Sequence, residues 1–172
     1  MEVKGIEYIQ PTKFWRMSSL QENWAHLGDE IDEFLEVALP CMQKMNKGIK
    51  LTSEEMNSIA MELADVQVMC NTIILLLDGV PVSEDDLPKD YRKYASFSDH
   101  IMRLLEIKAR ASTEAKTIIR GITTYSGPLC EALVRVICAA EYVMSWIYEN
   151  NENRHEIHKL VYLKNERRGY YA

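Results

Sequence analysis

The sequence predicts an all-α fold, a helical bundle of about five to six helices, on three observations. Apolar residues recur at three- and four-residue steps over long stretches, which places them on one face of a helix. Capping residues and Gly or Pro stops separate these stretches. Alternating patterns typical of strands are confined to short fragments near residues 6–10 and 122–125.

The 172 residues fit a single domain (1–172) with enough length for a hydrophobic core. Hydrophobic residues make up 47% and charged residues 27%, as in a soluble globular protein. The net charge of −6 argues against general affinity for nucleic acid or a membrane surface, so neither is expected as a partner. Four cysteines without a CxxC motif, and no recognisable secretory segment, lead us to expect a cytoplasmic protein.

The expected helices cover about residues 13–26, 29–47, 53–78, 99–120, 129–149 and 155–167. Gly28 is expected to loosen the join between the first two. Pro40 removes a backbone hydrogen bond within the second, so we expect a kink or a division there. Gly48 should end this helix.

The third helix has the clearest start. Thr52 is the expected N-cap, with Glu55 reaching back to it in a capping box. Gly79 and Pro81 should stop the helix shortly after residue 78. A turn-rich linker follows and leads to a short helix or loop near residues 89–94.

The remaining helices are delimited in the same way. Ser98 is the expected cap of the fourth helix, and Gly121 separates it from the fifth. A polar break at residues 150–153 precedes the last helix.

Two pairs of acids stand out: Glu30 with Glu33, and Glu62 with Asp65. Each pair is spaced by three residues, so its carboxylates are neighbours on one helix face. The second pair lies within an apolar stretch, residues 59–77, that predicts a buried helix. A buried carboxylate is costly unless it is paired or binds a metal. The acids therefore indicate a cation site.

Local neutralisation of the second pair is excluded, because no lysine or arginine lies between Leu51 and Lys89. The alternative is a structural salt bridge with a distant cation, for which Lys164, Arg167 and Arg168 are the candidates. Ligation by carboxylate oxygens alone favours Mg²⁺, with Mn²⁺ as a substitute, over zinc or copper.

Other chemistries find little support. The ExxH motif at residues 152–155 occurs once, whereas a four-helix di-iron site needs it twice, so a surface helix start is expected there. There is no GxSxG, Walker or GxGxxG motif. The basic C-terminal segment, residues 163–171, either complements its own helix dipole or binds phosphate oxygens. Beside an acidic metal site, the second interpretation describes a site for a polyphosphate.

With these motifs the chain resembles the MazG-like all-α nucleoside triphosphate pyrophosphohydrolases, a superfamily that includes the dimeric dUTPases. The family signature is ExxE, a spacer of one to three dozen residues, and ExxD on two antiparallel helices. Residues 30–33 (EIDE) and 62–66 (ELADV) match it, with 28 residues between Glu33 and Glu62. Residues 164–170 resemble the family's late K-N-x-x-R segment. Here residues 83–151 intervene before that segment, unlike in the simplest members.

The resemblance implies an enzyme that cleaves a (d)NTP between its α and β phosphates to give NMP and pyrophosphate. The implied ligands of one or more Mg²⁺ ions are Glu30, Glu33, Glu62 and Asp65, with Glu33 the candidate general base. The implied substrate-binding residues are Lys164, Asn165, Arg168 and Tyr170, and Trp24 is a candidate for stacking on the base. For Trp24, packing in the core is the alternative. The family also implies a homodimer or homotetramer.

Two alternatives stay open. A non-catalytic helical module of the same fold, binding nucleotide or protein, fits the same sequence. The helix order also suggests an internal repeat, residues 26–38 and 53–79 against 100–111 and 129–150. A degenerate second repeat (96–151) would then carry Glu131 and Val134 where the first half has Glu62 and Asp65. A chance likeness of amphipathic helices explains the same pattern.

Overall fold

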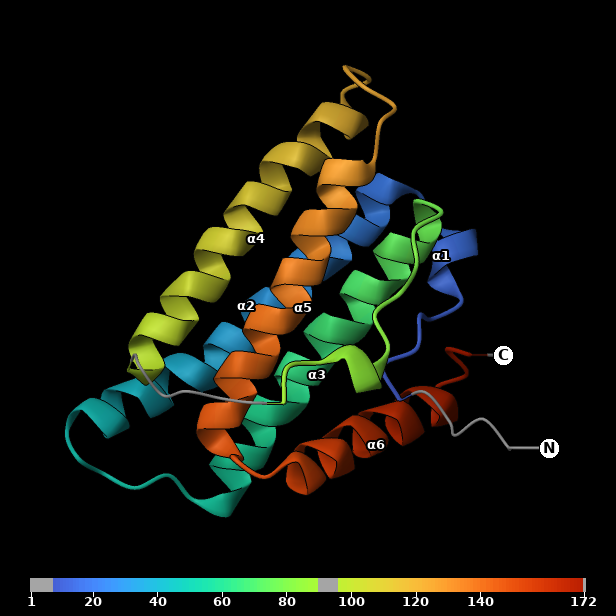
Figure 1. The fold of residues 1–172 in the computed structure, drawn as a ribbon. Helices are drawn as coiled ribbons and strands as arrows, with labels where there is room; N and C mark the ends of the chain where they lie inside the picture. The colour runs from blue at the N-terminus through green and yellow to red at the C-terminus, as the bar shows by residue number, and fades with distance from the viewer. Residues whose placement is uncertain (1–7, 90–95, 172) are drawn as a thin grey trace.

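The computed structural model describes residues 8–89 and 96–171, and within these the regular structure is entirely helical (Figure 1). The elements are α1 (Phe14–Met17), α2 (Leu20–Asn46), α3 (Ser53–Leu76), the 3-10 turn η1 (Glu84–Asp86), α4 (Phe97–Ile119), α5 (Gly127–Ile147) and α6 (Asn151–Arg167). The predicted all-α class is confirmed. The alternating fragment at residues 122–125 forms no strand, and the segment expected at residues 89–94 falls almost wholly outside the described residues.

Two long hairpins form the bundle. Helices α2 and α3 pack together as one hairpin and α4 and α5 as the other, and α3 contacts α5 across the bundle (Figure 1). Helix α6 crosses the end of the bundle and lies against α3. The central helix α3 therefore has neighbours on several sides, as its nearly continuous apolar sequence predicts.

By length and composition alone, α3 would be able to cross a membrane. However, 72% of its most apolar 18-residue window is buried inside the protein, and the core helix of a soluble protein passes the same test. Its apolar sequence is accounted for by its central position.

Helix α2 differs from the two helices expected over residues 13–47. A capping box between Ser19 and Glu22 starts a single helix that continues through Gly28 and Pro40. Glycine costs about 1 kcal/mol and proline about 3 kcal/mol in a helix interior. A buried stripe from Leu27 to Cys41 offsets these costs through packing. The first pair of acids consequently lies on one continuous helix.

The other boundaries follow their caps. At α3 the predicted capping box is confirmed, since Thr52 and Glu55 exchange hydrogen bonds of 3.1 Å. Helix α4 begins earlier than expected because Ser96, and not Ser98, is its N-cap. Helix α6 also begins earlier, because the Asn150 side chain caps it. Ser96 and Ser98 are the same residue type, so the sequence alone did not distinguish which of them caps α4.

A buried polar network holds α6 in place. Glu141 of α5 accepts hydrogen bonds from Arg154 Nε at 3.2 Å and from Gln67 Nε2 at 2.8 Å, and it lies 3.2 Å from His158 Nε2. Arg154 also donates to the Glu149 carbonyl near the end of α5. All four network side chains are buried. The network ties α3, α5 and α6 together and fixes where the C-terminal basic residues lie.

Candidate functional site

Three of the four predicted acids converge. Glu30 on α2 and Glu62 and Asp65 on α3 each place a carboxylate oxygen within 4.8 Å of the others. The two α3 acids share a helix face because they are three residues apart. Oxygen ligands lie about 2.0–2.6 Å from a divalent cation, so two ligands of the same ion are at most about 4–5 Å apart. The cluster is therefore of a size that can surround one ion after small adjustments.

Glu33 lies outside this group of three. Its side chain is exposed, one turn from Glu30 on α2. Its negative charge nevertheless helps to raise the pKa of Glu30 and Glu62, so it belongs to the same electrostatic site. Its exposed position suits a residue at the rim of the site.

The cluster is under electrostatic strain. Burial, followed by the charges of the other acids, raises the pKa of Glu30 to about 7. Burial is also the first cause of the raised pKa values of Glu62 and Asp65. In addition, Glu62 Oε2 is buried and has no hydrogen-bond partner among the residues that the structure describes. A carboxylate in this condition is stabilised by a cation.

The predicted basic face lies beside the acids. Lys164 Nζ donates to Asp65 Oδ2 at 2.6 Å, so the salt bridge considered as an alternative is formed. The charge of Arg168 lowers the pKa of both Glu62 and Asp65, which places it nearby as well. Asn165, which follows Lys164 in the sequence, is buried. Acids and bases separated by a hundred residues thus meet at one site.

A cavity of about 40 Å³ opens between these elements. Its lining residues are Thr12, Phe14, His26, Glu30, Asp65, Val68, Met69, Asn165, Arg168 and Tyr170. This volume holds a water molecule or a cation, and it is too small for a nucleotide. A nucleotide at this site must lie over the mouth of the cavity.

The N-terminal segment forms a wall that the sequence did not predict. Lys13 N donates to the Tyr170 carbonyl at 2.7 Å, and the Phe14 and Tyr170 rings lie 5.1 Å apart. His26 Nε2 lies 3.4 Å from Glu30 Oε1. The four-residue spacing of His26 and Glu30 was the available signal for this contact.

Trp24 lies apart from the acids. The Nζ atom of Lys108, on α4, sits 5.6 Å from the centroid of its ring. Glu30 follows Trp24 by six positions, so the two point to different sides of α2. Trp24 packs partly buried against the core and does not line the acidic cavity.

Binding of a divalent cation is expected to strengthen as the pH rises from about 6 to about 8. Below its pKa of about 7, Glu30 carries a proton that a cation must displace. In metal-free protein, the raised pKa makes the free energy of unfolding fall as the pH rises from about 4.5 to about 7. Over this range the unfolded chain releases a proton that the folded carboxyl keeps. Calorimetric titration with Mg²⁺ at several pH values measures the first effect, and thermal unfolding in EDTA the second. Glu30→Gln should flatten both profiles, and a cation affinity independent of pH would contradict the expectation.

The site as built places three carboxylates from two helices against Lys164 and Arg168 from the C-terminal segment. This arrangement can hold a cation and a phosphate in contact with each other. A scan against protein-family models, a search of curated proteins and a search of solved structures each found no match for this chain.

Proposed function

We propose that the protein is a metal-dependent (d)NTP pyrophosphohydrolase that cleaves the bond between the α and β phosphates. The products are NMP and pyrophosphate. The observation that supports this function best is the convergence of Glu30, Glu62 and Asp65 beside Lys164 and Arg168. In a complex of a polyphosphate with a divalent cation, the cation would face the carboxylates and the phosphate oxygens would face Lys164 and Arg168.

The residues of the cluster fit Mg²⁺. All three donors are carboxylate oxygens, which hard cations prefer. The unpartnered Glu62 Oε2 and the raised pKa values are the two signs of a site with too much negative charge. The ion pair of Lys164 with Asp65 neutralises only part of it.

The residues divide into three roles. Glu30, Glu62 and Asp65 would hold the cation, which when bound offsets phosphate charge and lowers the pKa of a water. Glu33, exposed at the rim, would accept the proton of the attacking water. Lys164 and Arg168 would bind oxygens of the β and γ phosphates, where negative charge develops as the bond breaks.

Pyrophosphate release tests this function directly. The full-length protein is assayed with each of the standard NTPs and dNTPs in the presence of Mg²⁺ or Mn²⁺. We expect turnover of at least one nucleotide, with NMP and pyrophosphate in equal amounts, and its loss on addition of EDTA. Release of inorganic phosphate in place of pyrophosphate would contradict cleavage between the α and β phosphates.

A second candidate is a non-catalytic module that binds nucleotide or protein. The observation that favours it is the Lys164–Asp65 ion pair, which already partners one acid within the chain. Nucleotide binding by the folded protein without turnover of any nucleotide in the panel would select this function. The homodimer or homotetramer expected from the family stays a prediction. Within the single chain, α4 and α5 already pack against α2 and α3.

A further inference from the structure

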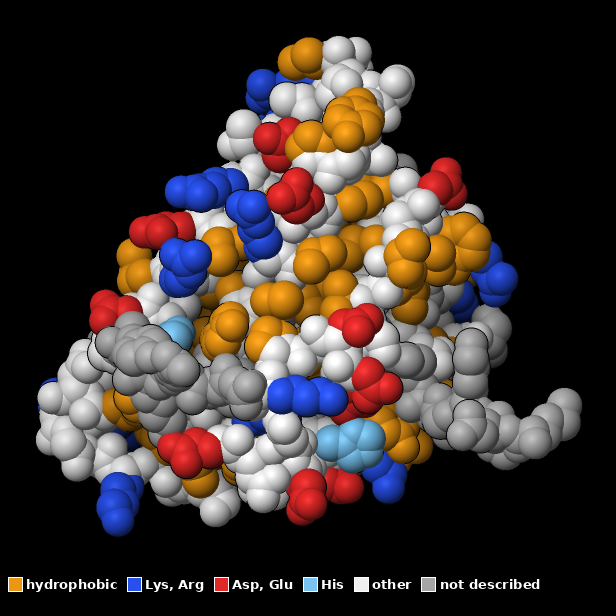
Figure 2. All heavy atoms as spheres, in the orientation of Figure 1, with side chains coloured by type: hydrophobic (Ala, Val, Ile, Leu, Met, Phe, Trp, Pro, Cys, Tyr) orange, Lys and Arg blue, Asp and Glu red, His pale blue; other side chains and the backbone are white. Residues whose placement is uncertain are grey.

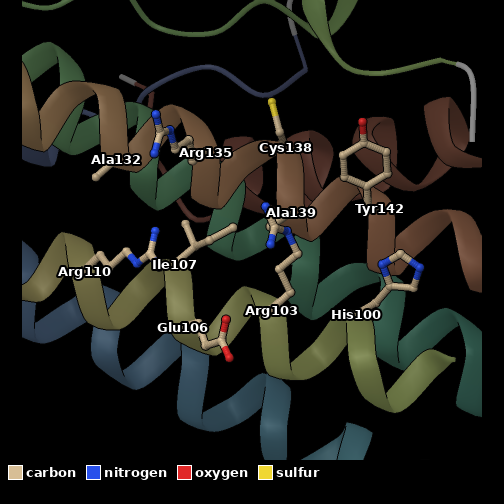
Figure 3. Close-up of a pocket in the computed structure, with 10 residues that line it drawn as sticks. All are labelled: His100, Arg103, Glu106, Ile107, Arg110, Ala132, Arg135, Cys138, Ala139 and Tyr142. Carbon is tan, nitrogen blue, oxygen red and sulfur yellow. The ribbon is translucent and has the colours of Figure 1, made fainter. Parts of the chain in front are cut away.

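A second groove lies between α4 and α5, on the other hairpin. Its volume is about 280 Å³, and it shares no lining residue with the acidic cavity. The residues that line it are His100, Arg103, Glu106, Ile107, Arg110, Ala132, Arg135, Cys138, Ala139 and Tyr142 (Figure 3). Several Lys and Arg side chains gather over α4 and α5, beside a hydrophobic band (Figure 2).

The charge of this groove is positive. Arg103 and Arg110 extend from α4 into the space facing α5, whereas the carboxylate of Glu106 points away from them (Figure 3). Among the described residues, neither of these two arginines has a carboxylate partner within salt-bridge distance. Arg135 contributes from α5, where its pair with Glu131 is largely exposed and therefore weak. Three guanidinium groups from two helices thus line one groove, with Arg103 two turns of α4 from Arg110.

The opposite end of the groove is flat and aromatic. The rings of His100 and Tyr142 lie 6.5 Å apart and only 19° from parallel. Burial lowers the pKa of His100, which favours the neutral form of its imidazole. Two turns of α5, about 10 Å, separate Tyr142 from Arg135. Ile107 and Ala139 provide apolar surface in between.

We propose that this groove binds a nucleoside monophosphate. Its phosphate lies toward Arg110 and Arg135, Arg103 faces the middle of the ligand, and its base lies against the ring of Tyr142. The volume is near the lower end of the range for small-molecule sites and matches a ligand of this size. Inorganic phosphate alone would leave the apolar wall and the aromatic end uncovered. A long nucleic acid is disfavoured by the protein's net charge of −6.

This site is independent of the proposed catalytic function, because its residues come from the other hairpin.

Calorimetric titration of the full-length protein with AMP, in EDTA, tests the proposal. AMP should bind without a divalent cation and at least about tenfold more tightly than adenosine or inorganic phosphate. The double substitution Arg103→Gln/Arg110→Gln should weaken AMP binding at least about tenfold, because it removes two positive charges and their hydrogen bonds to the ligand. Both side chains are exposed, and circular dichroism checks that the fold is retained.

Two matched variants locate the binding. Arg120→Gln removes an exposed arginine at the end of α4 outside the groove and should leave the AMP affinity unchanged. Glu62→Gln should also leave it unchanged, whereas loss of AMP binding in that variant would move the site to the acidic cluster and overturn the proposal. Absence of AMP binding at millimolar concentration, or equal affinity in the Arg103→Gln/Arg110→Gln protein, would overturn it too. Phosphate binding as tight as that of AMP would overturn the assignment of a nucleoside.

Discussion

Replacement of Arg154 by methionine is expected to lower the free energy of unfolding by about 3–5 kcal/mol. Arg154 is 1% exposed, and Glu141, to which its side chain donates, is 3% exposed. Without the guanidinium, the Glu141 carboxylate stays buried with only Gln67 and His158 beside it. The Glu149 carbonyl at the end of α5 also loses a donor. Urea denaturation followed by circular dichroism measures the change.

An exposed ion pair supplies the control. Arg135→Met breaks the Arg135–Glu131 contact, which lies on the surface, and should change stability by less than about 0.5 kcal/mol. Combining Arg154→Met with Glu141→Gln should destabilise less than the sum of the two single substitutions, because no uncompensated charge is left inside. A loss below about 1 kcal/mol for Arg154→Met alone would show that the network is not the anchor of α6.

The second large effect is expected at the acidic cluster. Glu62→Gln and Asp65→Asn should each lower pyrophosphate release at least about a hundredfold, as loss of a group that stabilises transition-state charge does. Each substitution keeps the shape of the side chain and removes its charge. Metal-free stability should not fall for Glu62→Gln, because burial and like charges already disfavour this carboxylate. Turnover is measured under saturating Mg²⁺ and nucleotide, with thermal unfolding as the check on folding.

The matched controls are acids on the neighbouring helix. Asp32→Asn and Glu36→Gln make the same chemical changes at exposed positions of α2, outside the group of three. Both variants should keep turnover within about twofold of the original protein. Near-normal activity of the Glu62 or Asp65 variant would exclude these residues as cation ligands. Equal losses in the two control variants would attribute the effect to general surface charge.

Much of the helical framework was predictable from local pattern. A long apolar stretch identified α3, and the Thr52 capping box located its start, because both signals are local in the sequence. The α2 region failed for the opposite reason. Gly28 and Pro40 are local breaking signals, and packing of the buried face against the bundle overrode them. The buried Arg154 was missed because a charged residue near a helix start is ordinarily exposed.

By itself, the sequence determined the helical class, the capping of α3 and the pairing of Glu62 with Asp65 on one face, since helix geometry fixes neighbours three residues apart. Only the tertiary structure decided which distant groups join them. Lys164 reaches Asp65 across 99 residues because α6 is anchored against α3, and Glu30 joins them while Glu33 stays exposed at the rim. Contacts of this kind depend on how whole helices pack, and local residue patterns do not encode that rotation and offset.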